Sequence, residues 1–348
     1  MKKIFYLVPL VSVLAACGSN GSGGAGAGAK QQIKIVGSST VYPFTTAVAE
    51  QFQRDNPNVS VVVESTGTGA GMKLFCAGVG ASFPDIEDAS RQIKKSEYDT
   101  CVKNGAKTII EVPIGIDGLT IIEGKGGQLA NLTQADIYKA LAANPFGKGP
   151  NKAQTWKDVN PALPAVKIRV LGPPPTSGTR DSLADLYLEK GCDTDPAMKE
   201  LKKSNEDQHK QVCTKIREDG VYVEAGENDN LLVQKVSAEP GTLGVLGFSY
   251  LDENADKVQA VQIAGVAPSE QTIANLSYPG ARKLYVYVKG EHLPAKPAIK
   301  DFIAAYSKQW GTGGPLEKRG LVPFSAADAS GATTQAGALK PLDPATLK

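Results

Sequence analysis

The stretch Ile33-Lys34-Ile35-Val36-Gly37-Ser38-Ser39-Thr40-Val41-Tyr42 decides the fold class. A β-branched run ends in a glycine and three hydroxyl residues. Apolar side chains then recur at helical spacing from Tyr42 until Asn56-Pro57 ends the predicted helix at Asp55. Val59 to Val63 follows as a second strand, so the chain begins as strand, polar turn, helix and strand.

The same alternation continues along the chain. Further helices are predicted at 72–77, 94–104, 133–142, 179–189 and 298–310, further strands at 108–114, 119–122, 167–171, 242–245 and 283–288, and the segments 230–237 and 258–263 complete the set. This order predicts an α/β fold with mostly parallel sheets flanked by helices. A length of 348 residues fits about two domains. The end of the chain is rich in Ala, Gly, Thr and Pro and is expected to be a loose tail.

The N-terminus has the layout of a secretory signal. Lys2 and Lys3 precede an apolar stretch too short to span a bilayer comfortably, so residues 1–16 are predicted to be a signal peptide. Leu14-Ala15-Ala16-Cys17 resembles the lipobox of bacterial lipoproteins, which implies cleavage before Cys17 and lipidation of its thiol. The alternative is a short signal peptide followed by a free thiol. Residues 17–32 are predicted to be the lipidated cysteine and a flexible linker, because Gly18 to Ala29 contains only Gly, Ser, Ala and Asn.

The remaining cysteines indicate disulfides. Cys76, Cys101, Cys192 and Cys213 are even in number, and an exported chain enters an oxidising compartment. Three connectivities are open. We favour Cys76 with Cys101 and Cys192 with Cys213, because each pair then encloses a short segment of one presumed domain. The alternative is four buried free thiols.

Charge and composition exclude several classes of function. Lys and Arg number 38 and Asp and Glu 36, so the formal net charge is only +2, and no basic tract is dense enough to grip nucleic acid. The two histidines, His209 and His292, lie far apart, which argues against a histidine-rich zinc site or a Ser-His-Asp hydrolase. A glycine-lysine phosphate loop is missing from the sequence. We therefore expect neither an enzyme nor a bound metal or cofactor.

Three hydroxyl-rich turns each open a predicted helix. They are Gly37 to Thr40, Ser65 to Gly71 and Thr176 to Thr179. The first turn of a helix offers unpaired N–H groups and a partial positive charge, and glycine lets the backbone approach a ligand. Several such turns meeting at the carboxyl ends of strands would enclose a small tetrahedral oxyanion with neutral donors. The alternative is that each segment is only a helix N-cap.

Two arginines are candidates to complete this site. Arg91 follows Asp88-Ala89-Ser90, and Arg180 follows the third turn. A guanidinium offers a planar fork that suits bidentate contact with an oxyanion. The neighbouring carboxylates, among them Asp181, are either ligand contacts or ion-pair partners of the arginines.

These motifs resemble the phosphate-binding proteins of bacterial high-affinity phosphate ABC transporters, which are type II periplasmic binding proteins. The resemblance covers Ile33 to Phe324. The segments that carry it are Gly37-Ser38-Ser39-Thr40-Val41, the Gly67 to Gly71 turn with Lys73 after it, Asp88-Ala89-Ser90, Ser177-Gly178-Thr179, and Tyr278-Pro279 leading into the strand at Leu284.

The resemblance implies two lobes joined by two crossover strands that act as a hinge, with phosphate buried between them. We expect lobe 1 to comprise 33–115 and 284–325, lobe 2 to comprise 116–283, and the tail to comprise 326–348. By motif, Thr40 and the Val41 backbone resemble the first ligand turn, Thr68 and Gly69 the second, and Ser177, Gly178 and Thr179 the third. The complete predicted ligand set is Ser39, Thr40, Val41, Thr68, Gly69, Ser90, Arg91, Ser177, Gly178, Thr179, Arg180 and Asp181.

The implied function is an extracytoplasmic lipoprotein, in the periplasm or on the cell surface, that captures inorganic phosphate and delivers it to the membrane permease of an ABC transporter. We expect it to act as a monomer. The alternatives are a receptor for another tetrahedral oxyanion, such as sulfate, and a phosphate-sensing or adhesion accessory.

The chain departs from the family pattern at two places. Arg91 stands where the family has an aspartate that accepts the proton of phosphate, and Pro173 stands where the family has an arginine. The guanidinium is therefore expected to have moved from the third turn to the second. We expect Asp181 or Asp88 to take over the role of the missing aspartate.

Overall fold

The computed structural model describes residues 31–175, 177–226 and 228–347. The predicted signal peptide, the lipidation site Cys17, nearly all of the predicted linker and Thr176 of the third turn lie outside this range. Within the described residues, no helix is both long and apolar enough to cross a bilayer.

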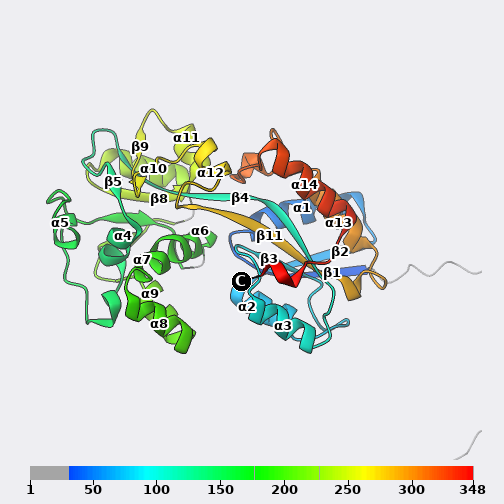
Figure 1. Ribbon diagram of the computed structural model, residues 1–348. Coiled ribbons are helices and arrows are strands. Elements are labelled where there is room, and N and C mark those ends of the chain that lie inside the picture. The colour runs from blue at the N-terminus through cyan, green and yellow to red at the C-terminus, as the bar shows by residue number, and fades with distance from the viewer. Residues whose placement is uncertain (1–30, 176, 227, 348) are drawn as a thin grey trace, which may run out of the picture.

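A mixed sheet of nine strands runs through both lobes of the molecule (Figure 1). Its order is β2-β1-β3-β11-β4-β8-β6-β7, and β9 also pairs with β4. The bounds are β1 (Gln31–Gly37), β2 (Val59–Ser65), β3 (Ile86–Ala89), β4 (Ile109–Gly124), β6 (Val170–Gly172), β7 (Tyr222–Glu224), β8 (Leu243–Gly247), β9 (Val258–Ala260) and β11 (Ala281–Lys289). A second, two-stranded sheet pairs β5 (Asn131–Leu132) with β10 (Gln262–Ile263). β1 starts two residues before the predicted strand, so the last two residues assigned to the linker belong to the sheet.

The first lobe is built on the predicted strand-helix-strand unit. β1 pairs in parallel with β2 and β3, and the chain returns through helices that flank this part of the sheet. These helices are α1 (Tyr42–Asp55), α2 (Thr68–Phe75), α3 (Lys95–Lys103), α13 (Ala298–Ser307) and α14 (Ala326–Ala338). α1 buries the face predicted from its apolar spacing, and Phe52 packs edge-on against Phe302 of α13 with ring centroids 5.4 Å apart.

The second lobe repeats this plan with shorter strands. β6 pairs in parallel with β7 and β8. The α-helices around them are α4 (Gln134–Leu141), α5 (Trp156–Val159), α6 (Gly178–Leu183), α7 (Lys190–Cys192), α8 (Pro196–Ser204), α9 (Glu206–Thr214), α10 (Asp229–Ala238), α11 (Phe248–Glu253) and α12 (Glu270–Ala274), and the π-helix η2 (Ala184–Glu189) joins α6 to α7. Short 3-10 helices stand at η1 (Pro145–Gly147), η3 (Gly290–His292), η4 (Glu317–Arg319) and η5 (Pro344–Thr346).

Two antiparallel strands, β4 and β11, connect the lobes (Figure 1). β11 pairs with β3 of the first lobe, and β4 pairs with β8 and β9 of the second. The separate strands predicted at 108–114 and 119–122 are wrong, because β4 is one strand of 16 residues. The residues between the two predicted strands also belong to β4, since Gly115 and Gly118 pair with Leu284 and Ala281 of β11.

Both predicted disulfides are confirmed. Cys76 is bonded to Cys101 and Cys192 to Cys213, with Cα atoms 4.1 and 5.4 Å apart. The first bond joins the end of α2 to α3, and the second joins α7 to α9. Each disulfide therefore lies within one lobe.

The loose C-terminal tail is not what the structure shows. Residues Ala326–Ala338 form α14, which packs on α13 and β4 and buries Ala332 and Ala336. Beyond the helix, the Leu342 amide donates to the carbonyl of Ile109 at the start of β4. The composition misled us because alanine and glycine bury little apolar area each, yet their small size lets a helix approach its neighbours closely.

The disulfide between α7 and α9 leads to a stability prediction. It closes a loop with a sequence separation of 21 residues that contains the largely polar α8, and neither α8 nor α9 was predicted. Replacing Cys192 and Cys213 together by Ala should lower the free energy of unfolding by about 3 kcal/mol, because the unfolded chain regains the entropy of the open loop. Urea unfolding followed by circular dichroism measures this. An unfolding midpoint equal to that of the oxidised wild type would contradict it.

Candidate anion-binding site

The first hydroxyl turn continues directly from β1. Gly37 has φ +131°, and a Cβ placed there would lie 2.1 Å from the carbonyl oxygen of Asp88 on β3, so only glycine fits. The buried Ser38 hydroxyl accepts the amides of Thr40 and Val41 at 3.2 and 3.4 Å. The turn is therefore held locally by a hydroxyl, although Ser38 does not cap α1, whose N-cap residue is Val41 and has no side-chain cap.

The second turn packs onto the first through Gly37. The amides of Thr66 and Gly67 donate to the Gly37 carbonyl at 2.9 and 2.8 Å. A Cβ on Gly71 would lie 2.5 Å from the Cα of Gly37, so the start of α2 and the end of β1 are in backbone contact. This contact fixes the second turn relative to the first.

The end of β3 joins the same junction. The Thr68 hydroxyl accepts the Ser90 amide at 3.1 Å and lies 3.0 Å from the Ser90 hydroxyl. The Ser38 amide donates to the Asp88 carbonyl at 2.7 Å. Thr68 and Ser90 were both predicted ligands, and the structure brings them together.

The third turn reaches this junction from the other lobe. A Cβ on Gly178 would lie 2.4 Å from the Thr40 amide nitrogen, and the Thr40 hydroxyl donates to the Gly178 carbonyl at 2.9 Å. The Ser39 hydroxyl donates to the carboxylate of Asp181. The Ser177 hydroxyl caps α6 by accepting the Thr179 amide at 3.2 Å. All three turns therefore meet in one place, where a local cap and a convergent site coexist.

The two arginines chosen from the sequence are engaged elsewhere. Arg91 forms two hydrogen bonds with Glu97, at 2.7 and 2.9 Å. Arg180 donates to the carbonyl of Pro173 at 3.2 Å and stacks on Tyr222, with its guanidinium carbon 4.3 Å from the ring centroid. The family's arginine has thus not been replaced by a free guanidinium on the second turn.

Among the residues that the structure describes, a cation that does reach the junction is Arg282 of β11, which was not predicted from the sequence. Its side chain is 9% exposed, and it donates to the hydroxyls of Thr40 at 3.0 Å and Ser182 at 2.6 Å. It also pairs with Asp117 of β4 at 3.3 Å and with Asp185 at 2.9 Å. One arginine therefore connects the first turn, the third-turn helix and both crossover strands.

Asp117 and Ser182 were missed together with Arg282. They are adjacent in space, since the Ser182 hydroxyl lies 2.9 Å from the Asp117 carboxylate. The available signal was an aspartate between Ile116 and the Gly118-Leu119 pair of a mostly apolar strand, because a buried charged group needs a partner. Asp117 and Arg282 are opposite each other in the β4–β11 register.

Two carboxyl groups near the junction, one half-buried and one fully buried, have raised pKa values. Burial raises the pKa of Asp181, and the nearby Asp185 adds to this, while the hydrogen bond from Ser39 opposes it. Asp88 is fully buried on β3, and the loss of solvation raises its pKa to about 8, although a hydrogen bond with Thr45 acts in the opposite direction. Both candidates for the missing aspartate are thus acids with a raised proton affinity.

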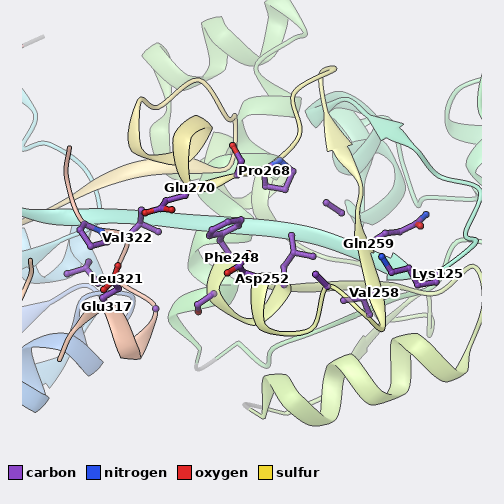
Figure 2. Close-up of a pocket in the computed structure, with 17 residues that line it drawn as sticks. Lys125, Phe248, Asp252, Val258, Gln259, Pro268, Glu270, Glu317, Leu321 and Val322 are labelled. Carbon is purple, nitrogen blue, oxygen red and sulfur yellow. The ribbon is translucent and has the colours of Figure 1, made fainter. Parts of the chain in front are cut away.

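A separate cavity of about 550 Å³ lies beside β4 (Figure 2). It is lined by Phe248, Leu251 and Asp252 of α11, by Pro268 and Glu270, and by Glu317 and residues 320–323 of the first lobe. The predicted ligand residues are not among those that line it. The hydroxyl turns are therefore a different location from this cavity.

Comparison with known proteins places the chain in a family. The profile described as "PBP superfamily domain" matches residues 23–307. The chain belongs to the periplasmic-binding-protein superfamily. Members of this superfamily are solute receptors, and the two lobes, the crossover strands and the junction of turns between them are the expected architecture.

Several individual proteins are similar to this chain over most of its length, and two of the three described here have names that mention phosphate. Protein SphX of Synechococcus elongatus is 35% identical over 85% of this chain and 79% of its own length. The phosphate-binding protein PstS of Staphylococcus saprophyticus is 28% identical over 84% and 80%. The crystal structure titled a possible phosphate binding protein, from Planctomyces limnophilus, superposes with a TM-score of 0.71 at 28% identity and covers 89% of this chain and 99% of its own.

The buried Asp88 predicts a pH dependence of stability. Its pKa is raised from about 3.8 in the unfolded chain to about 8 in the folded one, so the stability that its proton contributes is complete below about pH 4 and is lost as the pH rises to about 8. Asp88→Asn should therefore gain stability over the wild type by about 1.4 kcal/mol for each pH unit in this range. Urea unfolding of both proteins at several pH values measures it, and a constant difference would contradict it.

Proposed function

We propose that this chain is an extracytoplasmic solute-binding protein that captures inorganic phosphate between its two lobes and delivers it to the membrane permease of an ABC transporter. One observation carries the proposal: the three hydroxyl turns, from both lobes, meet at one junction of N–H groups, hydroxyls and a buried arginine. Such donors match the oxygens of a tetrahedral anion. The name of the relative PstS, a phosphate-binding protein, supports phosphate as that anion.

Several contacts across the lobes favour a closing mechanism. Thr40 of the first lobe bonds to Gly178 of the second, Ser39 bonds to Asp181, and Lys94 forms an ion pair with Glu206. Contacts made only when the lobes meet stabilise the closed form relative to the open form, and a ligand held by both lobes shifts the equilibrium further. A permease can then recognise the ligand-bound protein by the surface of its closed form.

Asp181 is our choice for the carboxylate that replaces the family's aspartate. It lies on the third turn and contacts the first turn through Ser39. Hydrogen phosphate can donate a proton to a carboxylate, whereas sulfate would leave two acceptors facing each other. Asp88 points its carboxyl into the first lobe, toward Thr45 of α1, and is therefore less suited to touch a ligand between the lobes.

The remaining parts of the proposal concern the setting of this protein. We place it in the periplasm or on the cell surface, anchored by a lipid on Cys17 and acting as a monomer. We propose no catalytic step and no cofactor. The pairing of all four remaining cysteines supports export to an oxidising compartment.

Closure can be tested at Gly178. A methyl group there would lie 2.4 Å from the Thr40 amide nitrogen, so Gly178→Ala should keep the third turn from reaching the first and weaken phosphate binding at least tenfold, or by about 1.4 kcal/mol. Gly331→Ala is the matched control, because a methyl group at that position on α14 meets no atom within 4 Å. Isothermal titration with phosphate measures both variants. Equal affinities would contradict the proposed site.

The role of Asp181 can be tested by selectivity. Wild-type protein should bind phosphate much more tightly than sulfate, and Asp181→Asn should narrow that difference, because the amide can donate to sulfate where the carboxylate cannot. Titration of both proteins with both anions measures this. Unchanged selectivity removes Asp181 from the role, and tighter binding of sulfate than of phosphate by the wild type would favour the alternative oxyanion receptor.

A further inference from the structure

Glu87 is a buried acid that the site described above does not use. It lies on β3 between β1 and β11, opposite Val36 and Tyr287, in a strand whose four residues are all buried. The side chain has no exposed surface. A charged residue in this position is rare unless it has a partner.

The structure gives the Glu87 carboxyl no such partner. Both oxygens are buried and without a hydrogen bond among the described residues. One of them lies against the backbone where the first two turns meet, since a Cβ built on Gly37 or Gly71 would be 2.9 or 3.0 Å from it. The carboxyl therefore sits directly behind the contact that fixes the second turn relative to the first.

The charges around Glu87 do not compensate a carboxylate. Burial is the main effect that raises the pKa of Glu87 well above its usual value, and Asp88 and Glu97 raise it further. The opposing cation is Arg91, whose guanidinium is shared with Glu97. On β11, the Tyr287 hydroxyl donates to Glu111, so it is already committed.

A neutral acid is compatible with this environment, and an ionised one is not. An isolated buried carboxylate takes up a proton rather than remain unsolvated. A bound anion at the adjacent turns would add repulsion in a region of low dielectric. Retaining the proton removes that repulsion.

We propose that Glu87 holds a proton behind the junction of the first two turns, and that binding of the anion is linked to retention of this proton. This inference rests on the proposed function. Glu87 lies behind the backbone of the turns, so only the loss of its proton, which leaves a negative charge there, is expected to affect the anion. At a pH where the free protein has lost this proton, anion binding should draw it back, and affinity should fall by up to tenfold per pH unit beyond the decline caused by the ligand's own titration.

The test is calorimetric titration with inorganic phosphate from about pH 7 to about pH 10, in pairs of buffers with different ionisation enthalpies, which counts the protons taken up. Glu87→Gln replaces the neutral acid by a neutral isostere. It should bind phosphate as the wild type does at pH 7 and take up fewer protons at alkaline pH. Glu64→Gln is the matched control, since Glu64 also pairs with Val36 in the sheet register but is exposed on β2. It should titrate like the wild type.

A second measurement separates this inference from the proposed function. Infrared spectroscopy of the wild type should show protonated-carboxyl absorption from both Glu87 and Asp88, whose pKa is also raised, and Glu87→Gln should lose the Glu87 part of it, with or without phosphate. If the wild type binds no phosphate, both the proposed function and the link between Glu87 protonation and phosphate binding are wrong. The infrared band still shows in that case whether Glu87 is protonated. If phosphate binds but proton uptake is equal in wild type and Glu87→Gln over the whole range, or if the band is unchanged, the inference is overturned.

Discussion

The arrangement of the candidate site depends on the close approach of backbone at Gly37. Its carbonyl accepts two amides of the second turn, and its Cα is in contact with Gly71 and with the Asp88 backbone. No side chain can be inserted at these positions without separating β1, α2 and β3. The hydroxyl groups of the first two turns are therefore held in fixed positions, because the backbone that carries them is closely packed.

The crossover strands supply the charged side chains at the junction, whereas the turns supply hydroxyl groups and backbone amides. β4 and β11 pass from one lobe to the other as a continuous antiparallel pair, and they carry Asp117 and Arg282 to the place where the lobes meet. A cation on the hinge strands touches both lobes at once. Within the described residues, the departure from the family at Pro173 therefore coincides with a buried guanidinium that reaches the first turn from another strand.

Local patterns predicted most of the fold. The helix at Tyr42–Asp55 has the predicted bounds, the three turns meet, and the cysteines pair as favoured, because apolar spacing, glycine and loop length act over short ranges. The continuity of β4 and the helix α14 were not predictable in this way. Both depend on partners distant in sequence, namely β11 for the former, and α13 with β4 for the latter.

The candidate site residues also divide into those that a local sequence pattern predicted and those that depend on contacts between distant residues. Thr40, Thr68 and Gly178 were visible because glycine and hydroxyl residues cluster before a helix, whereas Arg282 stands in a strand with no local mark of its function. Arg91 is the opposite case. It follows the expected motif, but its charge is satisfied by Glu97, six residues along the chain. The identity of a neighbouring residue in three dimensions decides whether an arginine is available, and sequence spacing does not contain that information.

Because each disulfide lies within one lobe, the rigidity of a lobe is independent of the motion between the lobes. Each disulfide joins two helices of the same lobe, while the described residues link the lobes through β4, β11 and noncovalent contacts. The lobes can thus move apart without straining a disulfide bond. The disulfides can therefore stabilise each lobe against unfolding without affecting the equilibrium between the open and closed forms.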